Sequence, residues 1–119
     1  MNFSIHDEEV DSDTHVISLG GEVDLYTAPE FKERMVQVIE EGKKRVVVDL
    51  SEATFIDSTT LGVLVGGVKR LRPAGGSLAL VCTDENITKI FEITGLDRVF
   101  PIHGSRDEAL EAIKSGATE

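Results

Sequence analysis

The chain has a single cysteine, few basic residues and no long apolar run, and each shortage narrows the possible functions. One cysteine cannot form an internal disulfide, and the place of Cys82 in the apolar run 78–82 predicts a small core residue rather than a reactive thiol. The longest weakly polar run, 59–68, is too short to span a bilayer, and the N-terminus lacks the basic and then apolar order of a signal peptide. We therefore expect a cytoplasmic protein.

Basic side chains are outnumbered by acidic ones. Twelve lysines and arginines stand against 22 aspartates and glutamates, which gives a formal net charge of -10. Nucleic acids and anionic membranes both require a basic surface, so the charge argues against both and favours a protein as the partner. The two basic clusters, 43–45 and 69–70, lie beside an expected strand and at the end of an expected helix, which indicates a solvated flank and a helix C-terminus.

The length and the hydrophobic pattern predict one layered domain. The 119 residues match the usual size of a single domain, which we expect to cover 1–119. Periodicity alternates between strand and helix spacing, which predicts an α/β fold in which one mixed five-stranded sheet carries about four helices, in the order β-β-α-β-α-β-α-β-α. The expected strands cover 3–5, 16–23, 45–50, 77–82 and 99–102, the first two as a hairpin-like pair around the polar stretch 7–13. The β-branched run 45–50 is typical of an interior parallel strand.

Capping signals mark where three of the helices begin. These signals lie at 27–30, 83–86 and 105–108, and the first and last have the spacing of a capping box. Pro29 fits the first turn of its helix, and Gly42 and Gly95 are expected to end the first and third helices. The last residues, 115–119, are expected to fray.

The second helix begins within 51–65. Either Asp57 or Ser58 can be its N-cap, because both side chains can accept a hydrogen bond from the first turn. Apolar residues follow at helical spacing and are expected to face the sheet: Leu61, Leu64, Val65, Val68 and Leu71. Three glycines interrupt it at a cost of roughly 1 kcal/mol each relative to alanine, which predicts close packing against the sheet at Gly62, Gly66 and Gly67.

No motif for catalysis, a cofactor or a metal is found. The three histidines have neither metal-ligand spacing nor a pairing with Cys82, and they are His6, His15 and His103. Gly20–Gly21 lacks the remaining glycines of a dinucleotide fingerprint, and there is no nucleotide phosphate loop. An acid/base pair drawn from Asp24, Asp49 and Asp57 is conceivable at strand ends, but structural roles at strand ends and caps are the favoured interpretation. We expect no catalytic residue, no cofactor and no metal.

The run Ser58-Thr59-Thr60 is the most distinctive feature, because it places three hydroxyls after Asp57 in the first turn of a helix. A helix N-terminus presents unpaired N–H groups and partial positive charge, so it can carry a phosphate. Simple capping is the alternative, and the physics of the segment alone favours it.

The stretch 57–64 resembles the phosphorylation motif of STAS-domain anti-sigma factor antagonists, in which Asp-Ser is followed by a small residue, glycine and Leu-Gly. Further segments at 21–24, 27–29, 46–50, 89–96 and 99–103 are similar to that family, especially its actinobacterial members, so the resemblance covers nearly the whole chain. The departure is Thr60, where glycine is usual, and its β-branched side chain could alter kinase access or the turn.

This resemblance implies a STAS-like fold and a partner-switching regulator without enzymatic activity. The unmodified protein would bind an anti-sigma factor of the serine kinase type and free a sigma factor. That partner would phosphorylate Ser58, and a serine/threonine phosphatase would reverse the modification. The implied partner-binding residues are Asp24, Tyr26, Thr27, Asp57, Ser58, Thr59, Thr60 and Gly62. Two alternatives remain: a constitutive STAS scaffold or transporter-complex module, and a small α/β enzyme that uses Asp49 or Asp57.

Overall fold

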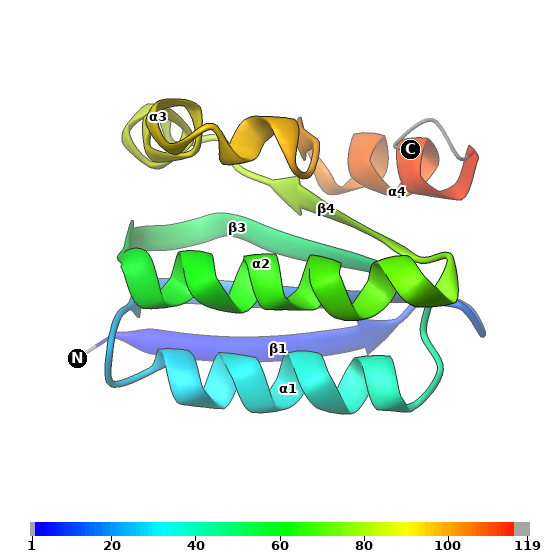
Figure 1. Cartoon of the computed structure of the whole chain (residues 1–119). Coiled ribbons are helices and arrows are strands. Elements are labelled where there is room, and N and C mark those ends of the chain that lie inside the picture. Colours follow the sequence, from blue (N-terminus) through cyan, green and yellow to red (C-terminus); the bar gives the residue numbers. More distant parts are fainter. Residues whose placement is uncertain (1, 116–119) are drawn as a thin grey trace.

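The strands form one mixed sheet whose order in space follows the order in the chain, β1-β2-β3-β4-β5, in the computed structural model, which describes residues 2–115 (Figure 1). The strands are β1 (Phe3–Glu9), β2 (Thr14–Val23), β3 (Arg45–Ile56), β4 (Ser77–Val81) and β5 (Ile102–His103). β1 is antiparallel to β2, and every other neighbouring pair is parallel. The predicted fold class, element order and opening strand pair are therefore confirmed.

Four helices cover the two faces of the sheet unequally. They are α1 (Ala28–Glu40), α2 (Ser58–Leu71), α3 (Glu85–Thr94) and α4 (Arg106–Ser115), and 3-10 turns lie at Arg72–Ala74 and Leu96–Arg98. Alternate residues of β3 point to opposite faces, so Val46 and Val48 join the core under α1, α2 and α3, whereas Val47 joins the smaller core under α4. Figure 1 shows α1 and α2 side by side across the first of these faces. Within the described residues, none of these helices combines the length and the apolar character needed to cross a membrane.

β3 is the central strand and is longer than predicted. Residues 46–50 of this strand are buried between β2 and β4, as the β-branched run 45–50 predicts. The strand then continues to Ile56 beyond the end of β4, pairing with β2 alone through shifts in register. This extension was missed because it is polar and half-exposed, so it lacks a strand periodicity. It brings the ends of β2 and β3 together, where Val23 pairs with Ile56 directly before α2.

The other strand boundaries also differ from those expected, and β2 begins two residues early, at Thr14. β1 continues through polar residues to Glu9, because an edge strand can expose its side chains while its backbone pairs with β2. β5 is only Ile102–His103, because the 3-10 turn at Leu96–Arg98 occupies the preceding residues. β4 ends at Val81, and Cys82 after it is buried in the core, as predicted.

The capping predictions are confirmed for α3 and only in part for α4. Asp84 caps α3 through its carboxylate, and Gly95 ends that helix in the left-handed region with φ of 77°. Ser105 accepts a hydrogen bond from the N–H of Glu108, but the Glu108 carboxylate returns to the N–H of Gly104 rather than to Ser105. The expected fraying at 115–119 lies outside the described residues, apart from Ser115, the last residue of α4.

α2 packs on the sheet with a stripe of residues that was predicted in part. Leu64, Val68 and Leu71 are buried and Leu61 packs against the core, but Val65 is only partly buried because it lies to the side of this stripe. The prediction of close packing at the glycines is right for Gly67 alone. A Cβ there would lie 3.1 Å from Met35 and 3.2 Å from Leu78, whereas nothing lies within 4 Å at either of the other two glycines of α2.

Lys43 corrects the interpretation of 43–45 as a solvated flank. Its side chain is only 7% exposed, and its Nζ donates hydrogen bonds to the Glu9 carboxylate at 2.6 Å and to the carbonyl oxygens of Asp11 and Ser12. A buried ammonium requires such partners. Lys43 therefore fixes the turn between β1 and β2.

Candidate functional site

The N-terminus of α2 is built around the carboxylate of Asp57. Asp57 has extended backbone angles, and its Oδ1 accepts hydrogen bonds from the N–H groups of Thr59 at 3.0 Å and Thr60 at 3.4 Å. These bonds satisfy two of the unpaired donors of the first turn. Of the two N-cap candidates that the sequence leaves open, the N-cap is therefore Asp57, and Ser58 is the first residue of the helix.

The three hydroxyls that follow Asp57 have different surroundings. The Thr59 hydroxyl donates to Asp57 Oδ1 at 2.7 Å. The Thr60 hydroxyl is fully buried and donates to the carbonyl oxygen of Val23 at 2.8 Å. Ser58 is exposed, and its hydroxyl makes no hydrogen bond to any residue in the described part of the chain. The first turn thus offers one free hydroxyl, that of Ser58, at the solvent-facing end of the helix.

Thr60 has a structural task at this turn. Its side chain is wholly buried, unlike the other residues that are expected to bind the partner. Its hydroxyl instead satisfies the last carbonyl of β2 and ties the start of α2 to the end of that strand. The β-branched side chain therefore leaves access to Ser58 unobstructed.

The electrostatics of the turn favour a negative charge. Partial burial raises the pKa of Asp57, but the Thr59 hydroxyl and the N–H groups of Thr60, Thr59 and Leu25 together hold that pKa below its ordinary value. The donors that stabilise this carboxylate are those of a helix N-terminus, which attracts anions in general. The site can therefore hold negative charge without rearrangement.

The loop 24–27 is ordered by its own hydrogen bonds. The Asp24 carboxylate accepts from the N–H groups of Tyr26 at 2.9 Å and Thr27 at 3.2 Å, and the N–H of Asp24 donates to the Thr27 hydroxyl at 2.8 Å. The predicted capping box at Thr27 is wrong in its bonding. Thr27 is the N-cap of α1, but its backbone is helical and its hydroxyl serves the loop instead of the helix.

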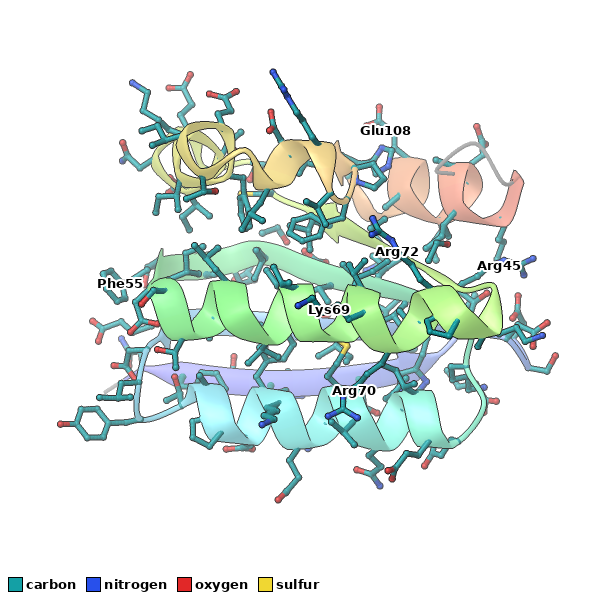
Figure 2. The ribbon with its side chains drawn as sticks, in the orientation of Figure 1. Arg45, Phe55, Lys69, Arg70, Arg72 and Glu108 are labelled. Atoms are coloured by element: carbon teal, nitrogen blue, oxygen red, sulfur yellow. The ribbon has the colours of Figure 1, made fainter. Side chains whose placement is uncertain are left out.

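Exposed apolar side chains lie at the same end of the sheet as Ser58. Leu25 is 60% exposed, Tyr26 79% and Phe55 49%, and all three lie at the ends of β2 and β3, which meet at the start of α2. Figure 2 places Phe55 at the end of the molecule where α2 begins. Large exposed apolar groups that gather on one surface indicate a protein contact. Sequence reasoning included Tyr26 but missed Leu25 and Phe55, because an isolated apolar residue in a loop or polar strand has no periodicity that shows its exposure.

The remaining predicted residue, Gly62, lies on the exposed flank of α2. A groove of about 330 Å³ runs between α1 and α2 beside it, and its lining includes Thr59, Gly62 and Gly66. The predicted residues of the loop 24–27 and of 57–62 thus share one end of the molecule, and all but Thr60 have some exposed surface.

The three aspartates considered for acid/base chemistry do not come together. Asp49 is 8% exposed and is bound by Arg106 and by the N–H and hydroxyl of Ser51. Asp24 and Asp57 each order their own turn, as described above. Each carboxylate therefore has a structural task. Among residues 2–115, no three His, Cys, Asp or Glu side chains form a group that could hold a metal ion.

Comparison with known sequences gives a consistent result. The STAS domain family matches residues 6–109. The anti-sigma-B factor antagonist of Listeria monocytogenes is 40% identical over 109 residues, which are 91% of this chain and 95% of that protein. The anti-sigma-B factor antagonist of Bacillus subtilis is 32% identical over 111 residues, which are 93% of this chain and 100% of that protein.

Among solved structures, an anti-sigma factor antagonist from Mycobacterium paratuberculosis superposes with a TM-score of 0.87 at 28% identity and covers 95% of each chain. An actinobacterial protein is thus among the similar structures. Its sequence identity is nevertheless lower than the 40% of the Listeria protein.

Proposed function

The chain belongs to the STAS domain family, and from that premise we propose that it is an anti-sigma factor antagonist switched by phosphorylation of Ser58. In its unmodified form it binds an anti-sigma factor of the serine kinase type, which then releases its sigma factor. The same partner transfers a phosphoryl group from ATP to the Ser58 hydroxyl, and a serine/threonine phosphatase removes it. The protein itself catalyses no reaction, and it acts in the cytoplasm, where RNA polymerase is found.

The observation that carries this proposal is the free hydroxyl of Ser58 beside an exposed apolar surface. A kinase needs an acceptor oxygen that it can reach, and of the three hydroxyls at this turn those of Thr59 and Thr60 are already bound. The partner-binding surface comprises Leu25, Tyr26 and Phe55 together with the start of α2. Burial of such a side chain at an interface is worth about 1.5–3 kcal/mol, so these residues can supply much of the affinity.

Phosphorylation would oppose binding through charge and bulk. A phosphate on Ser58 adds about 1.5 to 2 negative charges to this end of the molecule. The protein is already strongly acidic, and Asp24 and Asp57 lie at the same end of the molecule. A partner that fits the unmodified surface would have to bury the additional charge of the phosphate, and removing that charge from water costs free energy. A penalty of about 2.7 kcal/mol weakens binding about 100-fold. No refolding is required, because the helix N-terminus can hold the phosphate where it forms.

Incubation with the cognate anti-sigma kinase and ATP tests the proposal. We expect one phosphate per chain, mapped to Ser58 by mass spectrometry, and none on Ser58→Ala. Ser12→Ala is the matched control, because it removes an exposed hydroxyl in the turn between β1 and β2, outside the proposed surface, and should leave phosphate uptake intact. A chain that binds partners but takes up no phosphate would instead be a constitutive STAS module, such as a scaffold or transporter-complex subunit.

A further inference from the structure

The groove between α1 and α2 continues from the start of α2 along most of that helix. Its lining begins at Thr59, the residue after Ser58, and includes Arg70 in the last turn of α2. At a rise of about 1.5 Å per residue, these two residues are separated by about 16 Å along the helix axis, or about three helical turns. Figure 2 shows the Arg70 side chain between α2 and α1. The groove is therefore long enough to hold a segment of a partner.

The charge of the groove is opposite to that of the protein. Of the nine described residues that line it, Lys32 and Arg70 are basic and none is acidic, whereas the whole chain has 22 acidic side chains against 12 basic ones. Neither cation forms an ion pair or a side-chain hydrogen bond within the described part of the chain. The helix dipole can account for a cation at Arg70 but not at Lys32, which lies in the second turn of α1. Both charges are therefore available to an acidic partner.

The floor of the groove is apolar and open. Val36 of α1 and Val63 of α2 line it and are only partly buried, and Gly62 and Gly66 lie about one turn apart on α2. Apart from the helix itself and the adjacent residues, no atom lies within 4 Å of a Cβ added at either glycine. Side chains of another molecule can occupy that space.

The two helices that form the groove favour a helical occupant. Their backbone groups already form hydrogen bonds within each helix, so an extended segment would find no backbone partner along this surface. A helix satisfies its own backbone and can pack its side chains between two others.

We propose that the groove binds an acidic amphipathic helix of the anti-sigma factor, an inference that rests on the function proposed above. The apolar side of that helix packs on Val36 and Val63, and its carboxylates pair with Lys32 and Arg70. A phosphate on Ser58 lies at one end of the groove, so it adds repulsion between like charges to the other effects of the modification.

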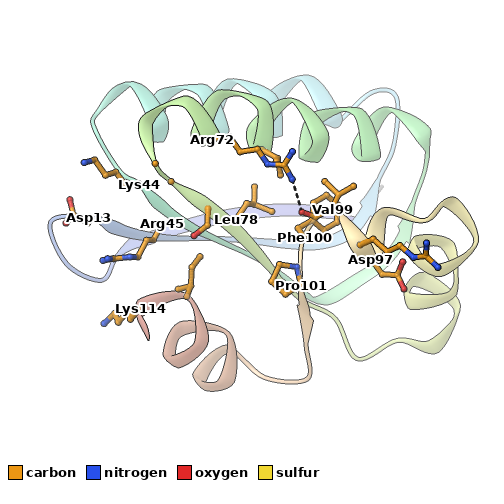
Figure 3. Close-up of a pocket in the computed structure, with 16 residues that line it drawn as sticks. Asp13, Lys44, Arg45, Arg72, Leu78, Asp97, Val99, Phe100, Pro101 and Lys114 are labelled. Atoms are coloured by element: carbon orange, nitrogen blue, oxygen red, sulfur yellow. Dashed lines mark hydrogen bonds between the residues drawn. The ribbon is translucent and has the colours of Figure 1, made fainter. Parts of the chain in front are cut away.

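A larger pocket of about 900 Å³ at the start of β3 and β4 also contains several basic side chains (Figure 3). Two aspartates, Asp13 and Asp97, line it as well, and it lies at the opposite end of β3 from Ser58. A partner that contacts Ser58 meets the groove directly, because the groove begins at the next residue. The groove is therefore the basic surface that such a partner would use.

Carbodiimide coupling of the wild-type chain to the anti-sigma factor tests the charge of the occupant. The reagent joins a lysine amine to a carboxylate in direct contact and leaves no spacer. Mass spectrometry should find Lys32 joined to an aspartate or glutamate in a helix of the anti-sigma factor. Lys69 on α2 and Lys89 on α3 lie outside the groove and should not be joined to it. A complex in which Lys32 is not coupled to the anti-sigma factor would overturn the proposal.

Two double variants with the same change in charge locate the contact. Lys32→Glu with Arg70→Glu reverses both cations of the groove. Lys69→Glu with Lys89→Glu is the matched control, because Lys69 also lies in the last turn of α2 and Lys89 in the second turn of α3. All four side chains are exposed, so both proteins should fold, which urea unfolding checks. In titration calorimetry with the anti-sigma factor, we expect the first pair to weaken binding at least about tenfold and the second less than about threefold, because direct charged contacts outweigh screened long-range charge.

The results separate this inference from the proposed function. Equal losses of affinity in the two pairs, while the wild-type chain still takes up phosphate at Ser58, would overturn the acidic helix and leave the phosphorylation switch in place. A wild-type chain that neither binds the anti-sigma factor nor takes up phosphate would overturn both.

Discussion

Alanine at the glycines of α2 should separate three positions that look equivalent in the sequence. Glycine in a helix interior is less favourable than alanine by about 1 kcal/mol. Gly62 and Gly66 have ordinary helical backbone and no atom within 4 Å of an added Cβ, so each substitution gains this helix term without a clash. We expect Gly62→Ala and Gly66→Ala each to stabilise the protein by about 0.5–1 kcal/mol, or roughly 4 °C in melting temperature.

Gly67→Ala is the matched control within the same helix. An added Cβ lies 3.1 Å from both Met35 Sδ and Met35 Cε and 3.2 Å from Leu78 Cδ1, so buried neighbours must move. Overpacking of this kind costs about 1–3 kcal/mol, which cancels or exceeds the gain in helix propensity from glycine to alanine. Urea unfolding of the three variants measures the difference. A Gly67→Ala protein as stable as Gly66→Ala, or a Gly62→Ala protein less stable than the wild type, would refute the packing described for α2.

Gly62 and Gly66 also connect stability with the proposed function. Gly62 and Gly66 lower the stability of α2, although no neighbouring atom in the chain requires a glycine at either position. A partner that approaches the helix closely along this flank would explain why both residues are glycine. Gly62→Leu should then weaken binding to the anti-sigma factor without lowering the free energy of unfolding. Unchanged affinity would place the flank outside the interface.

Three further predictions concern the start of α2. Asp57→Asn should lower the free energy of unfolding by about 0.5–1 kcal/mol at pH 7. Hydrogen bonds lower the pKa of Asp57 in the folded state, so the stabilisation by its carboxylate is complete above pH 3.8 and is lost as the pH falls through the lower folded-state pKa. Unfolding curves of the two proteins should therefore converge in acid. Thr60→Val should cost about 1–3 kcal/mol in urea unfolding, because the buried carbonyl of Val23 loses its donor; a neutral result would contradict that bond. Ser58→Asp should weaken partner binding less than phosphorylation does, since a carboxylate has one charge and less bulk than a phosphate. Calorimetry at two salt concentrations measures the loss of affinity in each form. Equal affinity of the wild type and the phosphoprotein would exclude the switch.

The sequence predicts those parts of the fold that have strong periodicity or an explicit cap. The buried run in the first half of β3 and the caps of α3 at Asp84 and Gly95 are examples, because local chemistry and tertiary structure agree there. The second half of β3 was not predictable in the same way, since its pairing with β2 is set by backbone contacts that leave no apolar alternation.

The candidate site was predictable in its location but less so in its bonding. A hydroxyl run after Asp57 indicates a helix start, yet only the arrangement in space assigns the Thr59 hydroxyl to Asp57 and the Thr60 hydroxyl to Val23. The same holds for Lys43, a residue typical of surfaces that is buried here by the Glu9 carboxylate and two carbonyl groups. Such assignments depend on residues that are distant in the chain.

The central claim is that the modification of one hydroxyl controls partner binding. The most direct test is titration calorimetry of the unmodified and the Ser58-phosphorylated chain against the serine-kinase-type anti-sigma factor, with Ser58→Ala treated in parallel with kinase and ATP. The account predicts tight binding of the unmodified chain, affinity lower by about 100-fold or more after phosphorylation, and no change in the alanine variant. Equal affinities of the two forms, or a phosphate mapped to Thr59 instead of Ser58, would contradict it.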